Sequence, residues 1–294
     1  VRRGLRGDLT LGRTLAAAGA KVAVATYNAP LAFGGTKVTF VHDVAFKRVP
    51  ETFPGLLRRR IALSVGRSVR VSDLVVTLTE FSKAELCATY PRLAPERVVV
   101  TYAAAADDFS RPRSQEQLDD VVRRFDLPDR FVLAVGNLQP RKNLVRLLEA
   151  TQQVGVPLVA TGQAGWLSDQ GLLTRLQADA QWLGRVSTDD LACLYRLCTV
   201  FAYPSLYEGF GLPVVEAMAS GAVVVTSRTT ALGEVAGDGA ILVDPTSADD
   251  IAVGLQRALA DGSDAWRAAA RARAARYRWV DSARLLYDAI STIA

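Results

Sequence analysis

Short apolar runs, rich in β-branched residues, alternate along the chain with longer segments in which apolar residues recur at helical spacing. Such runs predict strands that are buried on both faces of a parallel sheet. The predicted strands cover residues 21–26, 37–42, 74–79, 97–102, 131–136, 157–162, 199–204 and 222–227. The predicted helices cover residues 56–70, 118–125, 144–151, 172–180, 189–198 and 249–260. This alternation predicts an α/β fold with parallel sheets.

These strands are compatible with one closed barrel or with two doubly wound sheets. The stretch DDFSRPRSQEQ (107–117) favours two sheets, because it is polar, contains proline and follows a strand without joining it tightly to the next unit. We therefore expect two Rossmann-like domains facing a cleft, residues 1–110 and 111–294. The first domain is short for its class and opens on a helix. We expect its first strand and loop to be missing from this sequence; a reduced domain is the alternative.

Composition narrows the class of protein. Half of the 294 residues are apolar and 22% are charged, which is the balance of a soluble globular protein. No apolar run reaches the roughly 18–20 residues of a membrane span, and the N-terminus lacks the apolar core of a signal peptide. These features predict a cytoplasmic protein. The single histidine, His42, excludes an H-E-x-x-H metal site, and the three cysteines have no metal-ligand spacing, so we expect reduced, mostly buried thiols.

The net charge of +5 is unevenly distributed, since basic residues outnumber acidic ones only in residues 1–112. A basic N-terminal part is compatible with an anionic partner, such as phosphates or lipid head groups, or with an arginine-rich solvated surface. The sequence lacks the interleaved basic and aromatic residues that are typical of nucleic-acid-binding proteins, so nucleic acid is not expected as a partner.

The stretch YEGFGLPVVEAMASG (207–221) places two carboxylates around a glycine-rich turn. Glu208 follows a predicted strand, where parallel sheets bind ligands, and Glu216 lies one turn into the next helix. Pro213 suits the first helical position and Gly221 the C′ position that ends the helix. The free N–H groups at the helix start favour an anion. Two carboxylates flanking an anion site suit a ligand with phosphate in its middle and hydroxyls at both ends, such as a nucleoside diphosphate sugar.

A second motif, VGNLQPRKNLVRLLEA (135–150), places two cations at the end of another predicted strand. The strand ends at Gly136, Arg141 and Lys142 stand before the next helix, and Asn143 is its predicted cap. Two fixed cations beside a pyrophosphate stabilise the charge that develops as it leaves. A solvated basic turn is the alternative when this motif is considered alone.

Both motifs, together with LGRVSTDDLACLYRLCTVFAYPSLYEGFGLPVVEAMASGAVVVTS and ALGEVAGDGAILVDP, resemble the retaining glycosyltransferases of family 4, which have the GT-B fold. In the first part of the chain, VTFVHDVAFKRVPETFP and VVTLTEFSKAEL resemble mannosyltransferase-like members of the same family. The resemblance covers about residues 37 to 285. Glu208 and Glu216 match the two ends of the family's E-x7-E motif.

The resemblance implies a role for each matching residue. Arg141 and Lys142, after Gly136, match the pair that binds the donor diphosphate. Glu208 matches the glutamate that reaches the donor sugar, and Glu216 the one that binds the ribose. The remaining matches are Phe210, Gly211 and Leu212 at the sugar and phosphate, Gly184, Arg185 and Val186 around the nucleobase, and His42 and Ser82 on the cleft side of the first domain.

The resemblance thus implies retaining transfer of a hexosyl group, with mannosyl as the first candidate, from GDP-mannose or a UDP-hexose to a hydroxyl of a glycan or a lipid-linked acceptor. No metal and no cofactor is expected, because side chains supply the cations. A non-catalytic nucleotide-sugar-binding or partner protein is the main alternative, since the family's first strand and glycine-rich loop have no counterpart here. A phosphorylase of the same fold would need pyridoxal phosphate and a much larger chain.

The segment PGLLRRRIALSVGRSVR (54–70) carries arginines on a helix that also has an apolar face. Two interpretations remain open. The helix lies peripherally on an anionic membrane, at its inner face, or it covers the domain core with its apolar side. The last helix, around SARLLYDAI (282–290), is expected to pack back towards the first domain.

Overall fold

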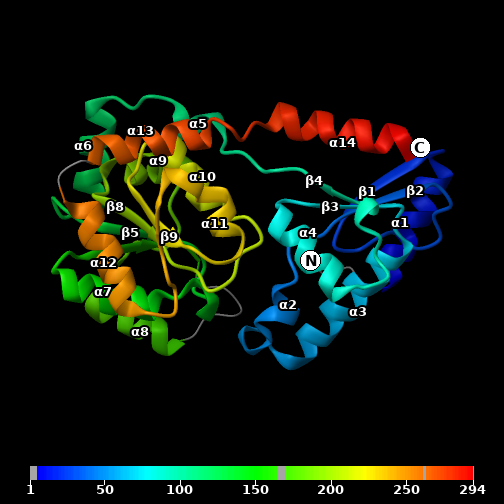
Figure 1. Cartoon of the computed structure of the whole chain (residues 1–294), viewed down its shortest axis with the longest axis horizontal. Coiled ribbons are helices and arrows are strands. Elements are labelled where there is room, and N and C mark those ends of the chain that lie inside the picture. Colours follow the sequence, from blue (N-terminus) through cyan, green and yellow to red (C-terminus); the bar gives the residue numbers. More distant parts are fainter. Residues whose placement is uncertain (1–4, 164–169, 261–262, 294) are drawn as a thin grey trace. The chain divides into compact units, whose positions relative to one another are not determined.

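The structure is a computed structural model that describes residues 5–163, 170–260 and 263–293. Contacts divide the chain into two compact units. The first contains the chain up to Ala103 together with the segment from Trp279 onward, and the second spans Ala104–Arg278. Each unit holds one sheet whose strands are all parallel, so the predicted α/β class is confirmed (Figure 1).

The first unit is built on a four-stranded sheet in the order β1-β2-β3-β4. Its strands are β1 (Val22–Thr26), β2 (Thr36–Phe40), β3 (Leu74–Thr77) and β4 (Val98–Val100). Each lies within a predicted strand or within a residue of one. Val75 on β3 is fully buried and pairs with Val98 on β4. β-Branched side chains fill both faces of such a sheet, which explains why the sequence pattern was a continuous apolar run.

Helices cover both faces of this sheet. They are α1 (Leu5–Ala17), α2 (Ala45–Arg48), α3 (Gly55–Val71), α4 (Glu80–Thr89) and α14 (Trp279–Ile293), with short 3₁₀ turns η1 (Pro50–Thr52) and η2 (Pro95–Arg97). Val65 of α3 and Leu86 of α4 share a core cluster with Val75. On the other face, Leu286 and Ile290 of α14 pack against the cluster around Val38. The end of the chain therefore belongs to the first unit.

The second unit is built on a six-stranded sheet in the order β10-β9-β8-β5-β6-β7. Its strands are β5 (Val132–Val135), β6 (Leu158–Thr161), β7 (Gln181–Trp182), β8 (Val200–Tyr203), β9 (Val224–Ser227) and β10 (Ile241–Val243). The chain runs outward from β5 to β7 and then returns to place β8 on the other side of β5. The strand order thus reverses between β5 and β8, and this reversal is the topological switch point of the sheet. Open parallel sheets bind ligands there, outside the carboxyl ends of the strands.

Helices lie on both sides of this second sheet (Figure 1). They are α5 (Asp107–Ser110), α6 (Gln115–Phe125), α7 (Leu144–Val154), α8 (Gln170–Asp179), α9 (Thr188–Leu197), α10 (Leu212–Ala219), α11 (Thr230–Ala236), α12 (Ala248–Leu259) and α13 (Ser263–Ala274), with η3 (Pro140–Lys142) and η4 (Gly237–Gly239). All three cysteines are free, and Cys193 and Cys198 are buried, as predicted. Burial raises the pKa of both thiols, so they are packing groups rather than nucleophiles.

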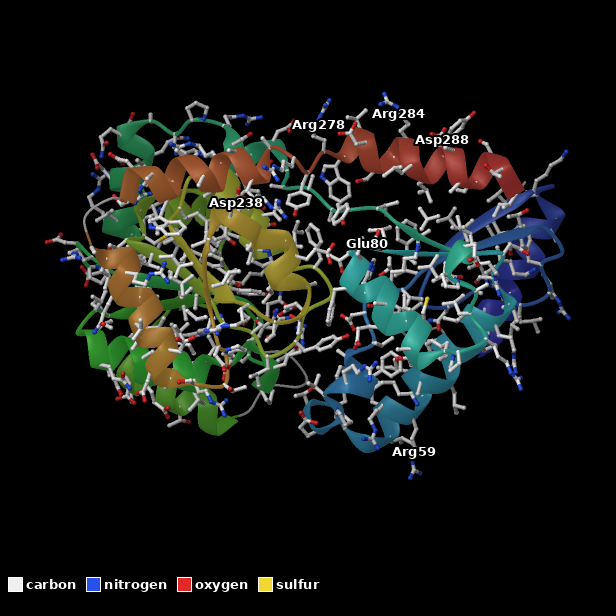
Figure 2. The ribbon with its side chains drawn as sticks, in the orientation of Figure 1. Arg59, Glu80, Asp238, Arg278, Arg284 and Asp288 are labelled. Atoms are coloured by element: carbon white, nitrogen blue, oxygen red, sulfur yellow. The ribbon has the colours of Figure 1, made fainter. Side chains whose placement is uncertain are left out.

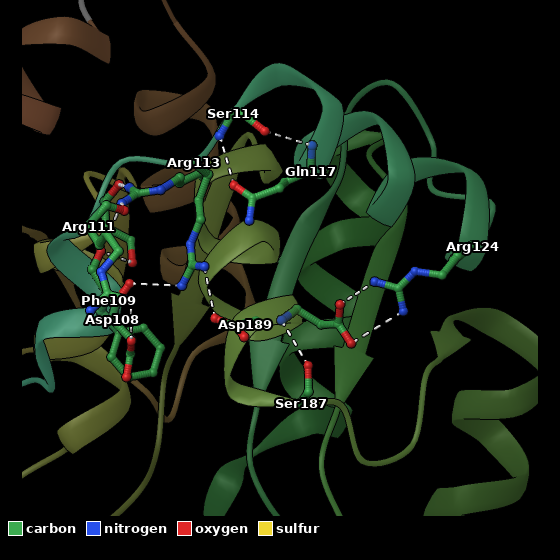
Figure 3. A network of polar contacts seen from close by, with 12 residues as sticks. Asp108, Phe109, Arg111, Arg113, Ser114, Gln117, Arg124, Ser187 and Asp189 are labelled. Carbon is green, nitrogen blue, oxygen red and sulfur yellow. Dashed lines mark hydrogen bonds and ion pairs between the residues drawn. The ribbon is translucent and has the colours of Figure 1, made fainter.

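The segment that the sequence marked as a boundary is bound to the second unit (Figure 3). Arg113 forms an ion pair of 2.8 Å with Asp189 at the start of α9. Arg196, from the end of α9, donates to the carbonyl of Phe109 at 3.0 Å, and the hydroxyl of Ser220 donates to the same carbonyl. The polar residues of this segment thus form bonds to α9 and α10. The boundary between the two units lies after Ala103, whereas the sequence predicted a domain boundary near residue 111.

The next helix, α6, is fixed by its ends (Figure 3). Ser114 and Gln117 form a reciprocal capping box, in which each side chain accepts from the other's backbone N–H. Near the other end, Arg124 forms an ion pair with Asp190 of α9. A capping box satisfies two N–H groups that the helix itself leaves unbonded, which explains why α6 begins directly after a proline-containing loop.

Candidate active site

Two loops meet where β5 and β8 are neighbours. The loop after β5 ends in η3 with Arg141 and Lys142, and the loop after β8 contains Glu208. The backbone N–H of Leu206 donates to the carbonyl of Arg141 at 2.8 Å, which joins the loops directly. A pocket of about 340 Å³ lies between them. It is lined by Gly136, Asn137, Gln139, Arg141, Lys142, Tyr203, Glu208, Gly211, Leu212 and Pro213.

Asn143 strengthens this junction in a way that the sequence did not predict. It occupies the N-cap position of α7 with a left-handed backbone (φ 61°), but its side chain makes no capping bond. The amide instead donates to the carbonyl of Pro204 at 2.9 Å and to that of Pro245 at 2.6 Å. Asn143 is therefore the N-cap residue by position, but the prediction that its side chain caps α7 is wrong. The side chain instead links the loops that follow β5, β8 and β10.

Glu208 is the centre of a buried charge cluster. Its Oε1 accepts from Lys142 Nζ at 2.6 Å, and its Oε2 pairs with Arg141 Nη1 at 2.8 Å. Only 9% of the Glu208 side chain is exposed, against 11% for Lys142 and 20% for Arg141. Arg141 is also held by the carbonyl of Tyr207 and the amide of Gln139. Carboxylate and cations are therefore held in one fixed geometry at the pocket.

Tyr203, at the end of β8, completes the cluster. Its hydroxyl donates to Glu208 Oε1 at 3.1 Å and accepts from Lys142 Nζ. The Lys142 ammonium also lies 4.6 Å from the centre of the Tyr203 ring, within the range of a cation–π contact. Burial, followed by the nearby Glu208 charge, raises the pKa of Tyr203 well above its usual value, so the hydroxyl stays protonated and remains a donor.

Glu208 is ionised despite its burial. Burial by itself favours the neutral carboxyl, but Lys142 and then Arg141 outweigh it and hold the pKa of Glu208 at about 2. The cluster therefore has two positive groups around one negative group at neutral pH. One excess cation remains at a pocket beside a helix start, which favours an anionic ligand.

This pKa predicts how stability depends on pH. A carboxyl whose pKa falls from 4.5 to about 2 on folding stabilises the folded state above pH 4.5, and this contribution is lost as the pH falls through that window. We expect wild type to lose about 2 kcal/mol of unfolding free energy relative to Glu208→Gln between pH 7 and pH 3. Urea unfolding of both proteins at several pH values measures the difference. Parallel pH profiles for the two proteins would contradict the charge cluster.

Gly211 allows α10 to begin at the pocket. Its backbone is left-handed (φ 92°), and a Cβ there would lie 2.3 Å from Leu232 Cδ2. Leu212 is the first helical residue, so Pro213 stands one position later than predicted, still within the first turn. The first N–H groups of a helix lack partners within it and point outward, here beside the lining residues Gly211 and Leu212. Gly221, at φ 78°, ends the helix as predicted.

Glu216 lies one turn further along α10 and outside the lining of this pocket. Its Oε2 accepts from the hydroxyl of Tyr195 at 3.2 Å. Burial raises the pKa of Glu216, and the Tyr195 bond opposes this. The two glutamates of the motif thus have different surroundings, since Glu208 is paired with cations and Glu216 with a neutral phenol. Phe210, between them, buries its ring against Tyr277.

Gly184, Arg185 and Val186 follow β7 at the edge of the second sheet. Gly184 has a left-handed backbone (φ 67°), and its carbonyl accepts from Gly162 N at 2.9 Å and from Thr161 Oγ1 at 2.6 Å. Arg185 is exposed. This loop is thus tied to the loop after β6, and its role at a nucleobase stays a prediction.

The two predicted residues of the first unit lie at the carboxyl ends of its strands. His42 follows β2, and burial lowers its pKa while Asp43 opposes this, so the imidazole is neutral at pH 7. Its Nδ1 is buried without a hydrogen-bond partner among the described residues. Ser82 is buried in the first turn of α4, where its N–H donates to Thr79 Oγ1. Their roles at a transferred sugar stay predictions.

Fold and site together define a protein of the GT-B class, whose second sheet presents basic side chains at its switch point. Residues 115–276 match the family described as "Glycosyl transferases group 1", and the chain belongs to that family. It is 35% identical over 247 residues to the O-antigen chain mannosyltransferase B of Escherichia coli, which covers 80% of this chain and 64% of that protein. The chain thus spans less than two thirds of that relative's length.

Solved structures share the fold. Sucrose-phosphate synthase from Thermosynechococcus elongatus superimposes with a TM-score of 0.78 at 20% identity, over 96% of this chain and 76% of that one. HepE from Anabaena, in complex with UDP-glucose, gives a TM-score of 0.75 at 20% identity, over 88% and 73% of the two chains. Both likenesses support the GT-B fold of this chain.

Two further observations concern the residues that the structure describes. None of their helices is both long and apolar enough to cross a membrane. None of their histidine, cysteine, aspartate and glutamate side chains forms a group of three that could hold a metal ion.

Proposed function

We propose that this protein transfers a mannosyl group from a nucleoside diphosphate sugar to a hydroxyl acceptor, with retention of configuration at the anomeric carbon. The observation that carries the proposal is the cluster of Arg141, Lys142 and Glu208 at the β5/β8 switch point, beside the start of α10. Cations and helix N–H groups bind a diphosphate, while a buried carboxylate next to them binds sugar hydroxyls. The acceptor is a hydroxyl of a glycan or of a lipid-linked glycan.

Each element has one role in the proposed reaction. Lys142 and Arg141 bind the diphosphate and stabilise its charge as the bond from the anomeric carbon to the diphosphate oxygen breaks. The acceptor oxygen forms its bond to the same face of that carbon, and its proton passes to the leaving diphosphate oxygen. Glu208 orients the sugar through its hydroxyls. Glu216 accepts from the ribose hydroxyls.

The remaining predicted residues extend this assignment. The backbone at Phe210, Gly211 and Leu212 meets the sugar and phosphates. Gly184, Arg185 and Val186 surround the base. His42 and Ser82 act from the first unit on the transferred sugar, and the neutral imidazole of His42 suits hydrogen bonding to a hydroxyl.

Mannose is favoured as the transferred sugar because the relative from Escherichia coli is an O-antigen mannosyltransferase. The base is a separate question, since the HepE structure contains UDP-glucose. A thermal-shift panel of GDP-mannose, UDP-glucose and UDP-N-acetylglucosamine tests the proposal, because a ligand that binds the native state raises its melting temperature. We expect GDP-mannose to give the largest shift. A shift without hydrolysis or transfer would indicate a binding protein, and no shift with any nucleotide sugar would overturn the proposal.

We also propose that α3 contacts an anionic membrane surface. Leu56 and Leu63 are each 75% exposed on this helix, and Arg59 and Arg60 lie exposed between them, while Val65 enters the core. Figure 2 shows Arg59 extending away from α3. Exposed apolar side chains beside arginines are typical of helices that lie in a lipid interface. A lipid-linked acceptor would be reached at such a surface.

Vesicle binding tests the membrane contact. Arg59→Glu is expected to weaken co-sedimentation with phosphatidylglycerol vesicles about fivefold or more, since each arginine near such a surface contributes about 1 kcal/mol. Arg257→Glu reverses the charge of another exposed arginine, on α12 of the second unit; it serves as the matched control and should leave binding unchanged. Equal binding to neutral and anionic vesicles would contradict this contact.

A further inference from the structure

A row of packed aromatic rings includes one hydrogen-bond donor to each glutamate of the motif. Tyr195, on α9, is fully buried and makes edge contacts with Phe109 at 5.8 Å and with Phe201 at 5.1 Å, measured between ring centres. Phe201 in turn stacks on Tyr203 at 5.9 Å. Because Phe201 packs in the same row without a hydroxyl, ring packing alone does not require a tyrosine at position 195. The hydroxyl of Tyr195 therefore needs a reason of its own, because a buried phenol group is costly unless it is hydrogen-bonded.

The partner of that hydroxyl is Glu216. The O–H of Tyr195 donates to Glu216 Oε2 at 3.2 Å, across the contact between α9 and α10. Within the described part of the chain, this is the one side-chain hydrogen bond of Glu216, and its Oε1 accepts none. Glu216 is half-buried, so one carboxylate oxygen is held from inside the domain while the other remains available to a ligand.

We propose that Tyr195 is a positioning residue, whose hydroxyl fixes the Glu216 carboxylate in the orientation that accepts hydrogen bonds from the ribose hydroxyls of the bound nucleotide. This rests on the proposed function of Glu216. A glutamate side chain has three rotatable bonds, and restricting them before binding removes that entropic cost from the binding step. Tyr195 is itself held between two aromatic rings, so its hydroxyl can hold the Glu216 carboxylate in one orientation.

Removal of one oxygen atom tests the proposal. Tyr195→Phe keeps the ring and its packing and removes only the donor. Calorimetric titration of the full chain with GDP and UDP, and with their 2′,3′-dideoxy analogues, compares affinities with and without ribose hydroxyls. The relevant ribonucleotide is whichever of GDP and UDP binds wild type more tightly. We expect Tyr195→Phe to bind that ribonucleotide about tenfold more weakly than wild type does, and to bind its dideoxy analogue with wild-type affinity. Tyr277→Phe, which also removes one phenol donor, here from the carbonyl of Val235, should change neither affinity.

The titrations distinguish failure of the Tyr195 role from failure of the Glu216 role. If Tyr195→Phe weakens the ribonucleotide and the dideoxy analogue equally, its hydroxyl has a merely structural role and the proposal is overturned. If wild type prefers the ribonucleotide and the variant keeps the same preference, Tyr195 does not position Glu216, although the nucleotide site itself stands. If wild type binds both analogues equally, the ribose role of Glu216 fails and this inference fails with it.

Discussion

Replacing Glu208 with glutamine is expected to lower the rate of mannosyl transfer at saturating donor by about a hundredfold or more. Glutamine fills the same volume and can still accept from Lys142, so the pocket keeps its shape. It lacks the charge that holds both cations at 2.6 and 2.8 Å. It also lacks the second carboxylate oxygen that the proposal assigns to the sugar hydroxyls. The initial rate of transfer of labelled mannose from GDP-mannose, measured at several donor concentrations, gives the effect.

The control for this variant is Glu116→Gln, which neutralises an exposed carboxylate in the first turn of α6. It should retain wild-type turnover. Melting temperatures of both variants at neutral pH show whether a rate change reflects unfolding. A Glu208→Gln protein that is folded and transfers mannose at a near-normal rate would remove Glu208 from the reaction.

Replacing Lys142 with methionine is expected to weaken binding of GDP about tenfold or more, because a hydrogen bond to a charged group contributes about 1.5–3 kcal/mol. Methionine preserves the apolar stem that packs against Gly136, where a Cβ added to the glycine would lie 3.4 Å from Lys142 Cε. GMP should lose less affinity than GDP, since it lacks the second phosphate that the proposal assigns to the Lys142 ammonium. Turnover should fall further than affinity, because charge on the diphosphate grows as it leaves.

Lys21→Met is the matched control for this variant, since Lys21 is exposed before β1 in the first unit. Its affinity for both nucleotides should equal that of wild type. A Lys142→Met protein that binds GDP and GMP with unchanged affinities would contradict the assignment of the diphosphate to this pocket.

The sequence predicted the fold class well because parallel strands buried on both faces leave a strong local pattern. The eight predicted strands correspond to β1–β6, β8 and β9. Among the described residues, the strands β7 and β10 lie outside these eight runs. β7 has only two residues, and the apolar run around β10, Ile241–Val243, is shorter than the six-residue stretches that predict the other strands. The strand order was also beyond reach, since the return of β8 to β5 is a long-range pairing.

The charged residues of the site could be predicted from the sequence, but their partners could not. Arg141, Lys142 and Glu208 stand out because they follow strand ends in glycine- or proline-containing loops. Tyr203 and Tyr195 did not, because they fall within an apolar strand and an amphipathic helix, where an aromatic residue indicates only packing. Their hydroxyls gain significance from neighbours that are distant in the sequence. A tyrosine near the end of the predicted strand 199–204, before a ligand loop, is the signal that was available.

The most direct test of the donor site is a crystal structure of the full chain with GDP-mannose bound. We predict that diphosphate oxygens lie about 3 Å from Lys142 Nζ and from backbone N–H groups at Gly211 and Leu212. The mannose should then contact Glu208 and the ribose Glu216. A nucleotide bound away from the loops that follow β5 and β8 would contradict the central claim that their junction is the donor site.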